Sequence, residues 1–472
     1  MDNVIVIGAG LGGLEVGYIL ARHGLRVTVL EQESQIGGCL QTFRRLGRTF
    51  DTGFHYVGGL DEGQSLHPLF KYFNLLDLPW RRLDEDCFDE VFIEGAGAFP
   101  FASGHERFVE RLSEKFPGSR EELRKYASFL KGVGDHIFDS FDSPSENFSK
   151  SAYEFLCGTV SDPLLRKVLS GTSLKMELNA DTLPLYIFAQ INNSFIQSAW
   201  RLEGGGELIA ARLASQIESF GGQVRTRARV EHLVEEGGRI ARVELEGGET
   251  LSADWVVSDA HPAVTLGLVS DTKMLRRIYR NRISSLKNTF GMFTANICLK
   301  KDSLPYLNRN VFVHTAGADL WRPDASRTES VLVHSYVPEE GSYSTHLDIL
   351  SPMSIDSRTE DYEARKEAKA RECLSLAEKA IPGLSDAVER VFTSTPLTYE
   401  SYTGTPGGSA YGVAKDWMNP MGTILSPRTP IPNLLMTGQS LNLHGILGVS
   451  MTSVFTSACI LGMDALKAEI LP

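Results

Sequence analysis

The first thirty residues combine two apolar runs with a helical repeat between them. Val4–Ile7 is a continuous apolar run, which is typical of a strand buried on both faces of a parallel sheet. Apolar residues then recur at helical spacing until Gly24, and a second apolar run follows at Val27–Leu30. This pattern predicts a strand, a helix and a second strand within about 30 residues, the unit from which parallel sheets are built.

Further along the chain the pattern changes several times. Residues 104–200 are predicted to be mostly helical, and an apolar stripe there is typical of a helix facing the core (Leu123, Tyr126, Phe129, Leu130, Val133 and Ile137). Phe290–Leu299 and Val331–Val337 are predicted strands. Glu360–Ala380 has the pattern of a solvated amphipathic helix that ends before Pro382.

The last apolar stretch, from Gly445 to Met463, carries no charge and approaches the length of a membrane span. It is rich in glycine, serine and threonine, so we expect a buried helix there rather than a span. No basic, apolar and cleavable leader precedes Val4, so we expect a cytoplasmic protein.

Composition limits the possible functions. The 472 residues exceed what one core accommodates, so more than one is expected. A net charge of −12 argues against nucleic acid as a partner. The six cysteines form no CxxC pair, which argues against a metal site or a disulfide scaffold and suits a reducing compartment.

The turn between the first strand and helix carries the strongest chemical signal. It has the spacing Gly-x-Gly-x-x-Gly, and Glu31 closes the second strand. Glycine at these positions permits a tight turn, a close approach of a pyrophosphate to the backbone, and packing of helix on strand. An acid at that distance accepts hydrogen bonds from ribose hydroxyls. We therefore expect a dinucleotide here, held by Glu31 and by Gly8, Gly10, Leu11, Gly12 and Gly13.

A second glycine turn directly follows that acid. Gly37–Phe43, with sequence GGCLQTF, resembles the second FAD-contacting loop of the glutathione-reductase-like flavoproteins. The resemblance implies FAD rather than NAD, with contacts from Gly37, Gly38, Cys39 and Thr42. Amine oxidases of that group carry arginine where this chain has Cys39, which counts against an amine oxidase.

The resemblance extends along nearly the whole chain. The GGCxxTF turn and the FDTGxHYxG segment at 50–58 are similar to the retinol saturases, within the phytoene desaturase and carotenoid isomerase family of flavoenzymes. So are segments at 204–258, 395–398, 408–412, 435–439 and 445–448. The resemblance implies that the start of the last helix faces the flavin and stabilises its anionic reduced form. It implies further cofactor contacts at Gly53, His55, Val230, Gly438, Gln439, Gly448 and Val449.

The fold class implied is α/β, a discontinuous FAD-binding Rossmann domain of the glutathione-reductase type with an inserted α+β substrate domain. We expect the FAD domain at 1–75, 201–265 and 428–472. The substrate domain is then 76–200 and 266–427, with its helical part at 104–200.

The chemistry implied is hydride transfer to or from a carbon–carbon double bond of a lipophilic isoprenoid or polyene, most like a saturase. Saturation also needs a proton donor within reach of the second carbon. The candidates are Tyr411, His55 with its neighbour Tyr56, and His444. Each is also interpreted as a packing or cofactor-shaping residue, and the family has no single agreed acid.

Two alternatives stay open. One is a carotenoid or phytoene desaturase or isomerase of the same family. The other, of a different class, is a lipid-binding chaperone like the GDP-dissociation inhibitors, which do not use FAD. No second Gly-x-Gly-x-x-Gly lies between a strand and a helix, so NAD(P)H is expected only as a transient electron donor, and the donor or acceptor is open.

A basic segment interrupts the acidic chain. Lys273–Lys287 contains six lysines and arginines and no acid, with Leu275, Ile278, Tyr279 and Ile283 among them. Such an element is most often a solvated face, the interpretation favoured here. The alternative is peripheral contact with a membrane of anionic lipids.

Overall fold

The computed structural model describes residues 2–141, 143–270, 272–354 and 362–471. A five-stranded parallel sheet has the order β10-β2-β1-β14-β20, and it takes its strands from three separated stretches of chain. The predicted first and second strands are its centre. Their bounds are β1 Asn3–Ile7, β2 Arg26–Leu30, β10 Gln223–Arg225, β14 Trp255–Ser258 and β20 Leu434–Met436.

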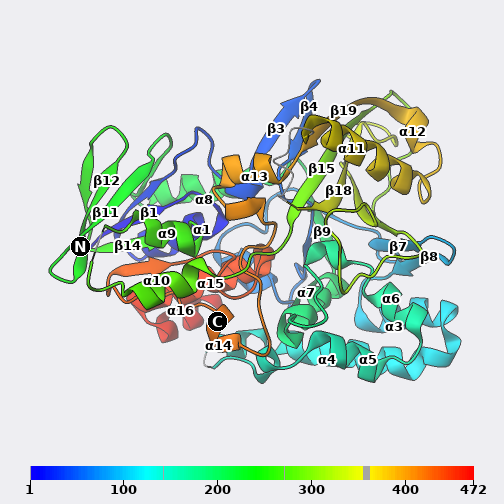
Figure 1. The fold of residues 1–472 in the computed structure, drawn as a ribbon, viewed down its shortest axis with the longest axis horizontal. Coiled ribbons are helices and arrows are strands. Elements are labelled where there is room, and N and C mark those ends of the chain that lie inside the picture. The colour runs from blue at the N-terminus through cyan, green and yellow to red at the C-terminus, as the bar shows by residue number, and fades with distance from the viewer. Residues whose placement is uncertain (1, 142, 271, 355–361, 472) are drawn as a thin grey trace.

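Helices cover this sheet. The glycine turn leads into α1 (Leu11–Arg22), which packs between α8 (Glu207–Ser219) and α15 (Gly445–Leu461) (Figure 1). α16 (Met463–Ile470) and α2 (His67–Tyr72) pack together beside them. The predicted buried helix near the C-terminus is confirmed as α15. None of the helices in the described ranges combines the length and hydropathy that crossing a bilayer requires.

A three-stranded ribbon extends from the left of the molecule in Figure 1. Its strands are β11 (Val230–Glu236), β12 (Arg239–Leu245) and β13 (Thr250–Ser252), and a turn at Gly237 and Gly238 joins the first two. α9 (Pro262–Leu268) and α10 (Arg277–Ser284) lie beside the ribbon.

A seven-stranded sheet forms the upper right of Figure 1, with the order β19-β15-β18-β17-β16-β7-β8. All neighbours are antiparallel except β16 and β7. The two predicted strands are confirmed as β15 and β17. The bounds are β7 Asp89–Ile93, β8 Gly97–Phe101, β15 Gly291–Leu299, β16 Asn310–His314, β17 Ser330–Ser335, β18 His346–Met353 and β19 Val388–Ser394.

One face of this sheet packs on α11 (Tyr362–Glu378) through a separate apolar core that includes Cys373, Leu376 and Ala377. α11 confirms the predicted amphipathic helix, of which residues 360 and 361 lie outside the described part. α12 (Leu384–Ala387) and α13 (Pro396–Thr403) flank β19 in sequence. A short helix, α14 (Pro420–Thr423), precedes β20.

The segment predicted to be helical is helical. It contains α3 (His105–Lys115), α4 (Arg120–Asp135), α5 (Ala152–Thr159), α6 (Pro163–Leu169) and α7 (Leu185–Gln197). Within the predicted stripe Leu123, Tyr126 and Leu130 are fully buried, and α4 packs on α7. The stripe is therefore core, as expected. The domain limits given above stay a prediction.

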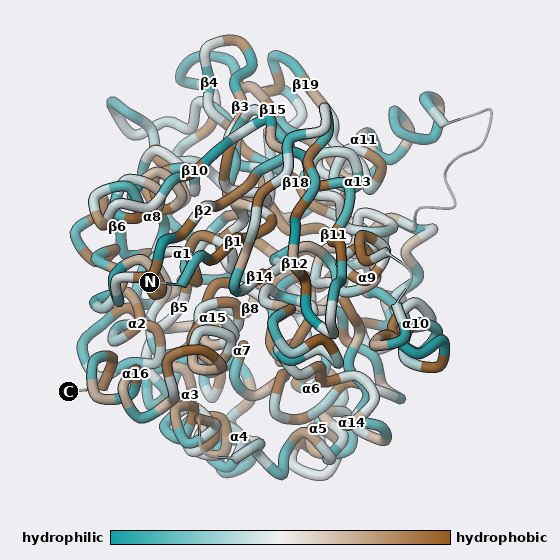
Figure 2. The backbone as a smooth tube through the Cα atoms, turned by 90° about the vertical axis from the view of Figure 1, so that its left-hand side faces the viewer, coloured by the Kyte–Doolittle hydropathy of each residue, from teal (hydrophilic) through white to brown (hydrophobic). Residues whose placement is uncertain are grey.

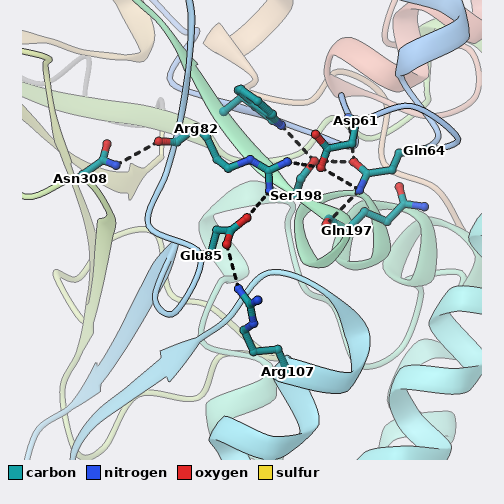
Figure 3. A network of polar contacts seen from close by, with 9 residues as sticks. Asp61, Gln64, Arg82, Glu85, Arg107, Gln197, Ser198 and Asn308 are labelled. Carbon is teal, nitrogen blue, oxygen red and sulfur yellow. Dashed lines mark hydrogen bonds and ion pairs between the residues drawn. The ribbon is translucent and has the colours of Figure 1, made fainter.

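A small sheet joins three segments that are distant in the sequence, with the strand order β5-β9-β6. β5 is Val57–Gly58, β6 is Trp80–Arg82 and β9 is Ala199–Leu202. Figure 3 shows the polar network beside it, centred on Arg82, which pairs with Asp61 and with Glu85. Gln64 accepts a hydrogen bond from the Ser198 hydroxyl and donates one to the carbonyl of Gln197. The network therefore fixes the end of α7 against the segment that contains Asp61 and Gln64. A hairpin, β3 (Thr42–Arg45) with β4 (Arg48–Asp51), precedes this region.

Candidate functional site

One cavity of about 480 Å³ brings the predicted site residues together. Its lining contains almost every residue predicted to contact the cofactor and all three candidate proton donors. These are Gly8, Gly10, Leu11, Gly12, Glu31, Gly37, Gly38, Cys39, Gly53, His55, Val230, Tyr411, Gly438, Gln439, His444 and Val449. Gly13, Thr42 and Gly448 lie outside the lining.

The turn before α1 is closely packed. Gly8 has φ +94° and donates its N–H to the Leu30 carbonyl at 2.8 Å. A Cβ on Gly12 would lie 3.1 Å from the Cα of Gly438, and a Cβ on Gly13 would lie 2.0 Å from the carbonyl oxygen of Gly8. The absence of a side chain on Gly12 therefore lets the turn approach the segment at Gly438. Gly13 lets α1 pack on β1, which explains why Gly13 lies behind the cavity and not in its lining.

Glu31 is fixed at the carboxyl end of β2. One of its carboxylate oxygens accepts the Ala9 N–H at 2.8 Å and the other accepts the Glu33 N–H at 2.9 Å. The side chain is buried yet lines the cavity, beside Val230. A carboxylate held in this way is placed to accept the hydroxyl protons of a ribose.

Asp259, directly after β14, fills the concave side of the glycine turn. Its two carboxylate oxygens lie 2.6 and 2.5 Å from where a Cβ would stand on Gly10 and on Gly12. The N–H of Gly13 donates to this carboxylate, while burial and the nearby charge of Glu31 raise its pKa to about 7. Sequence reasoning missed Asp259, because only the fold brings β14 beside the turn.

The second glycine turn borders the same cavity. Gly37 and Gly38 both have positive φ, at +114° and +56°. Gly37 donates its N–H to the Ala9 carbonyl at 2.7 Å, which ties the two turns together. The side chain of Cys39 is open to the cavity. Thr42 instead donates its hydroxyl to Glu207 at 2.6 Å, so it supports the turn from outside.

The N-terminus of α15 closes the far side. His444 is its N-cap, and Ile446 and Leu447 of the first turn line the cavity. Gly448 lies behind them, since a Cβ there would lie 2.3 Å from the Leu443 carbonyl oxygen. The positive end of the helix dipole therefore points at the cavity, an arrangement that favours negative charge there.

The residues present fit FAD. Gly10 and Gly12 have no side chain that would block a pyrophosphate, the Asp259 carboxylate lies in the space beside them, and Glu31 suits the ribose. Thr437 Oγ1 and His55 Nδ1 are buried, line the cavity and have no hydrogen-bond partner among the described residues. A polar ring system such as the flavin would satisfy groups of this kind.

The candidate proton donors are close together but already engaged. Tyr411 donates its hydroxyl to the Leu174 carbonyl, and burial raises its pKa well above the usual value. The His444 ring lies tilted against the Tyr411 ring, with 4.5 Å between their centroids, and its Nε2 lies 3.2 Å from the Lys175 carbonyl oxygen. Burial lowers the pKa of His444 to about 4, and burial together with the charge of Arg201 lowers that of His55 to about 4. Both imidazoles are therefore neutral near pH 7.

A buried ion pair at the cavity wall was not predicted. The ammonium of Lys175 lies 2.7 Å from Asp89 Oδ2, and their side chains are 5% and 0% exposed. The sequence shows only a lysine between Leu174 and Met176, and nothing there pairs it with an aspartate on β7.

One further part of the wall is apolar. It is formed by side chains of α7 and of three strands of the seven-stranded sheet, namely Ile191, Phe195, Met292, Leu332 and Leu350, together with Leu174. We refer to this part of the cavity as the apolar chamber. It is continuous with the glycine turns and with α15.

Comparison with known proteins agrees with this geometry. The model of the family described as flavin containing amine oxidoreductase matches residues 11–460. The all-trans-retinol 13,14-reductase of Rattus norvegicus is 26% identical over 97% of this chain and 85% of its own length. The chloroplastic prolycopene isomerase of Daucus carota is 23% identical, over 99% of this chain and 82% of its own. An oxidoreductase from Methanosarcina mazei has the same fold, with a TM-score of 0.66 at 19% identity, covering 96% of this chain and 98% of that one.

Proposed function

The chain belongs to the flavin-containing amine oxidoreductase family, and on that premise we propose that it transfers a hydride to or from a carbon–carbon double bond of a lipophilic polyene. Membership makes it an FAD-dependent oxidoreductase, as the glycine turns predicted. The proposal concerns the substrate and the direction, for which a saturase of retinoid-like or carotenoid-like polyenes is the first candidate.

The observation that carries this proposal is the apolar chamber. It opens into the same cavity as the dinucleotide turn and the N-terminus of α15, so an apolar molecule there meets the cofactor directly. Its walls are aliphatic and aromatic, and a hydrocarbon chain gains about 25 cal/mol for each Å² of surface that it buries against such walls. A small charged amine would gain little from this surface.

The chain itself supplies binding, orientation and electrostatics. FAD, when bound, supplies the exchange of a hydride with a carbon. Gly10 and Gly12 would border its pyrophosphate once the Asp259 carboxylate beside them is protonated or turned away, Glu31 would accept from the ribose, and the α15 N-terminus would stabilise negative charge on the pyrimidine side. The buried walls of the chamber exclude water from the reacting carbons.

Saturation is placed first because the retinol reductase covers most of both chains at 26% identity. A desaturase or isomerase is the second candidate, supported by the prolycopene isomerase at 23%. The non-catalytic chaperone is disfavoured, since the family is one of flavin-containing oxidoreductases and the ribose acid Glu31 is in place.

The electron donor is also a proposal. NAD(P)H would bind only transiently at the cavity, or a separate reductase would supply the electrons. Mixing the oxidised holoenzyme with NADH and NADPH under anaerobic conditions tests this, because bleaching of the flavin at a saturable rate supports direct donation. No bleaching with either nucleotide assigns the task to a reductase.

We also propose a cytoplasmic location with peripheral contact to membranes. The contact would give the enzyme access to its substrate, since polyenes dissolve in bilayers. α10 would provide the contact. Figure 2 shows it at the edge of the molecule, largely hydrophilic. Ile278 is 79% exposed among exposed Arg276, Arg277 and Arg282, whereas Ile283 points into the core. The test is co-sedimentation of the protein with vesicles of anionic lipids at low salt. Sedimentation that becomes weaker with added salt and in the variant Ile278→Asp supports this contact, and no sedimentation at low salt refutes it.

The main proposal is tested by single turnover. The holoenzyme is reduced with dithionite, freed of excess reductant and mixed anaerobically with a panel of polyenes and enones. Flavin reoxidation with a product heavier by two mass units supports saturation. Reduction of the oxidised enzyme by a polyene, with a product lighter by two units, supports desaturation, and no reaction with any of them refutes the proposed substrate class.

A further inference from the structure

The ion pair between Lys175 and Asp89 is unlike the other charged pairs of this molecule. Most described ion pairs have side chains that are a fifth or more exposed, whereas this one is buried at the wall of the cavity. Removing two charges from water costs several kcal/mol per ion, so such a pair needs compensation. Here Tyr56 and Asn310 each donate to Asp89 at 3.0 Å, which leaves that carboxylate fully engaged.

The ammonium of Lys175 is engaged less completely. It has three N–H bonds, and Asp89 is its one ion-pair or hydrogen-bond partner within the described residues. Aromatic rings surround it: the Phe195 centroid lies 4.2 Å from Nζ, and those of Tyr56, Phe88 and Phe312 lie within 5.7 Å. Ring faces stabilise a cation, yet they do not accept its proton.

Lys175 is also placed beside the flavin side of the cavity. Its carbonyl contacts His444, the N-cap of α15, and the carbonyl of Leu174 accepts from Tyr411. Lys175, Phe195 and Tyr56 all line the cavity. The main chain of Lys175 therefore lies where the chamber meets the N-terminus of α15, and its ammonium lies against Phe195 and Tyr56 of the cavity wall.

The other candidate donors are unsuited to give a proton. Tyr411 donates to Leu174 and Tyr56 donates to Asp89, and burial raises the pKa of both. His55 and His444 are neutral. Among the five groups considered, Lys175 is the one that carries a positive charge and has N–H bonds not engaged by an acceptor.

We propose that Lys175 is the proton donor of the reaction, a conclusion that rests on the proposed saturation of a polyene. The π bond of the substrate breaks. One carbon receives the hydride, with both electrons, that reduced FAD supplies, and the other end of the conjugated bond receives a proton from Nζ. The N–H bond breaks and leaves a neutral amine, which recovers its proton from solvent before the next turnover.

Asp89 positions this acid and keeps it protonated. Its charge raises the pKa of Lys175, and burial lowers it, with burial the larger effect. The balance leaves an ammonium that gives up its proton more readily than an exposed lysine, which suits a general acid. Asp89 acts through Lys175 and is a positioning residue.

The test uses two variants that separate charge from acidity. Lys175→Arg keeps the positive charge and an ion pair with Asp89, but a guanidinium does not release its proton in proteins. Lys175→Met removes both charge and acidity. Each holoenzyme is reduced with dithionite and mixed with the best polyene of the panel, and flavin reoxidation is followed. Both variants are expected to be slower by about 10²-fold or more, the usual contribution of a general acid.

Controls make the result specific. Lys369→Met removes another buried lysine, whose ammonium contacts the carbonyls of Arg327 and Pro352, and it is expected to react like wild type. FAD content reports folding for every variant. If Lys175→Arg does not retain FAD, the doubly neutral variant Lys175→Met/Asp89→Asn, which leaves no unpaired charge, takes its place in the same measurement.

The pH profile provides a second readout that a structural role would not change. Since Lys175 must be protonated, the wild-type rate constant falls as pH rises through its pKa. Asp89→Asn removes the charge that favours the ammonium, so the descending limb of the pH–rate profile moves to lower pH. The other groups facing the pair are Tyr56 and His444 at the cavity and Arg201 behind Asp89, and none of them loses a charge in this variant.

The outcomes distinguish the two proposals. If wild type does not react with any polyene, the proposed function fails. If wild type reacts, and Lys175→Arg reacts within about threefold of it or Asp89→Asn leaves the pH limb unmoved, the function stands and Lys175 is not the donor. Slow reoxidation in both lysine variants with an intact FAD content, together with the shifted limb, supports the assignment.

Discussion

At the start of α1, a carboxylate occupies the place that a phosphate needs. Asp259 accepts from Gly13 and lies against Gly10 and Gly12, so it uses the positive end of the helix in the same way as a pyrophosphate. Bound FAD brings further negative charge to this turn. The two anions therefore repel each other unless Asp259 is protonated or its side chain turns away.

This repulsion predicts that FAD affinity depends on pH. The pKa of Asp259 is about 7 without FAD, and the pyrophosphate raises it further, so binding takes up a proton. Affinity is greatest below pH 7 and falls by up to about tenfold per pH unit above it. Equilibrium titration of the apoprotein with FAD between pH 6 and pH 9 measures this slope.

Asp259→Asn keeps the shape and removes the charge, and it should bind FAD more tightly than wild type at pH 8, with little pH dependence. Asp348→Asn is the matched control: burial raises the pKa of Asp348 also to about 7, but it contacts Tyr336 and Asn296 away from the turn. A slope that persists in Asp259→Asn would contradict this account.

The residues proposed to form the cofactor cradle could be named from the sequence because their spacing is local. Gly8, Gly10, Gly13 and Glu31 lie within one strand-helix-strand unit, where spacing alone fixes geometry. Asp259 and Lys175 were not visible, because each acts through a partner that only tertiary structure brings near.

Among the elements, the close contact between β5 and α7 is the most sensitive. A Cβ on Gly58 would lie 2.3 Å from the carbonyl carbon and oxygen of Ser194, and 2.6 Å from the nitrogen of Phe195. These are main-chain atoms, so the clash is relieved only by moving the helix. Ser194 and Phe195 line the cavity, so this contact also sets the shape of the chamber.

Gly58→Ala is therefore expected to destabilise the holoenzyme by about 1–3 kcal/mol, the usual cost of overpacking. Gly132→Ala is the control, since Gly132 lies in α4 and no atom stands within 4 Å of its added Cβ. That change should be neutral or stabilising by up to about 1 kcal/mol through helix propensity. Urea unfolding of both variants gives the comparison, and equal stability of the two would show that the contact is looser than described.

Elements were predictable where length and periodicity were clear. The uncharged run at Gly445 gave α15, and the apolar runs gave β1, β2, β15 and β17. The sheet β5-β9-β6 was not predicted, because its strands are two to four residues long and come from distant parts of the chain. Such short strands carry no periodic signal of their own.

At the scale of the whole molecule, the cavity joins the two large sheets. The five-stranded sheet presents the glycine turns to it, and the seven-stranded sheet presents Met292, Leu332 and Leu350. The proposed cofactor and substrate sites are thus separate walls of one space, and we expect that they can be altered independently.

Leu332→Trp tests this separation. The larger ring should obstruct the apolar chamber and weaken polyene binding by about 1–3 kcal/mol, or roughly 5- to 150-fold, while FAD content stays unchanged. Reoxidation of the reduced flavin by a small quinone is the internal control and should proceed at the wild-type rate. An equal fall in the reoxidation rate with the polyene and with the quinone would place the effect of the substitution at the flavin instead.

Bound FAD in this cavity underlies every role assigned to these residues, and the flavin content of the purified protein tests it directly. We expect about one FAD per chain in wild type, released on denaturation and identified by chromatography and mass. In Gly12→Val the added side chain meets Gly438 and Asp259, so this variant should purify without flavin. Wild-type protein that contains no flavin and takes up none from added FAD, or Gly12→Val with full flavin content, would contradict the account.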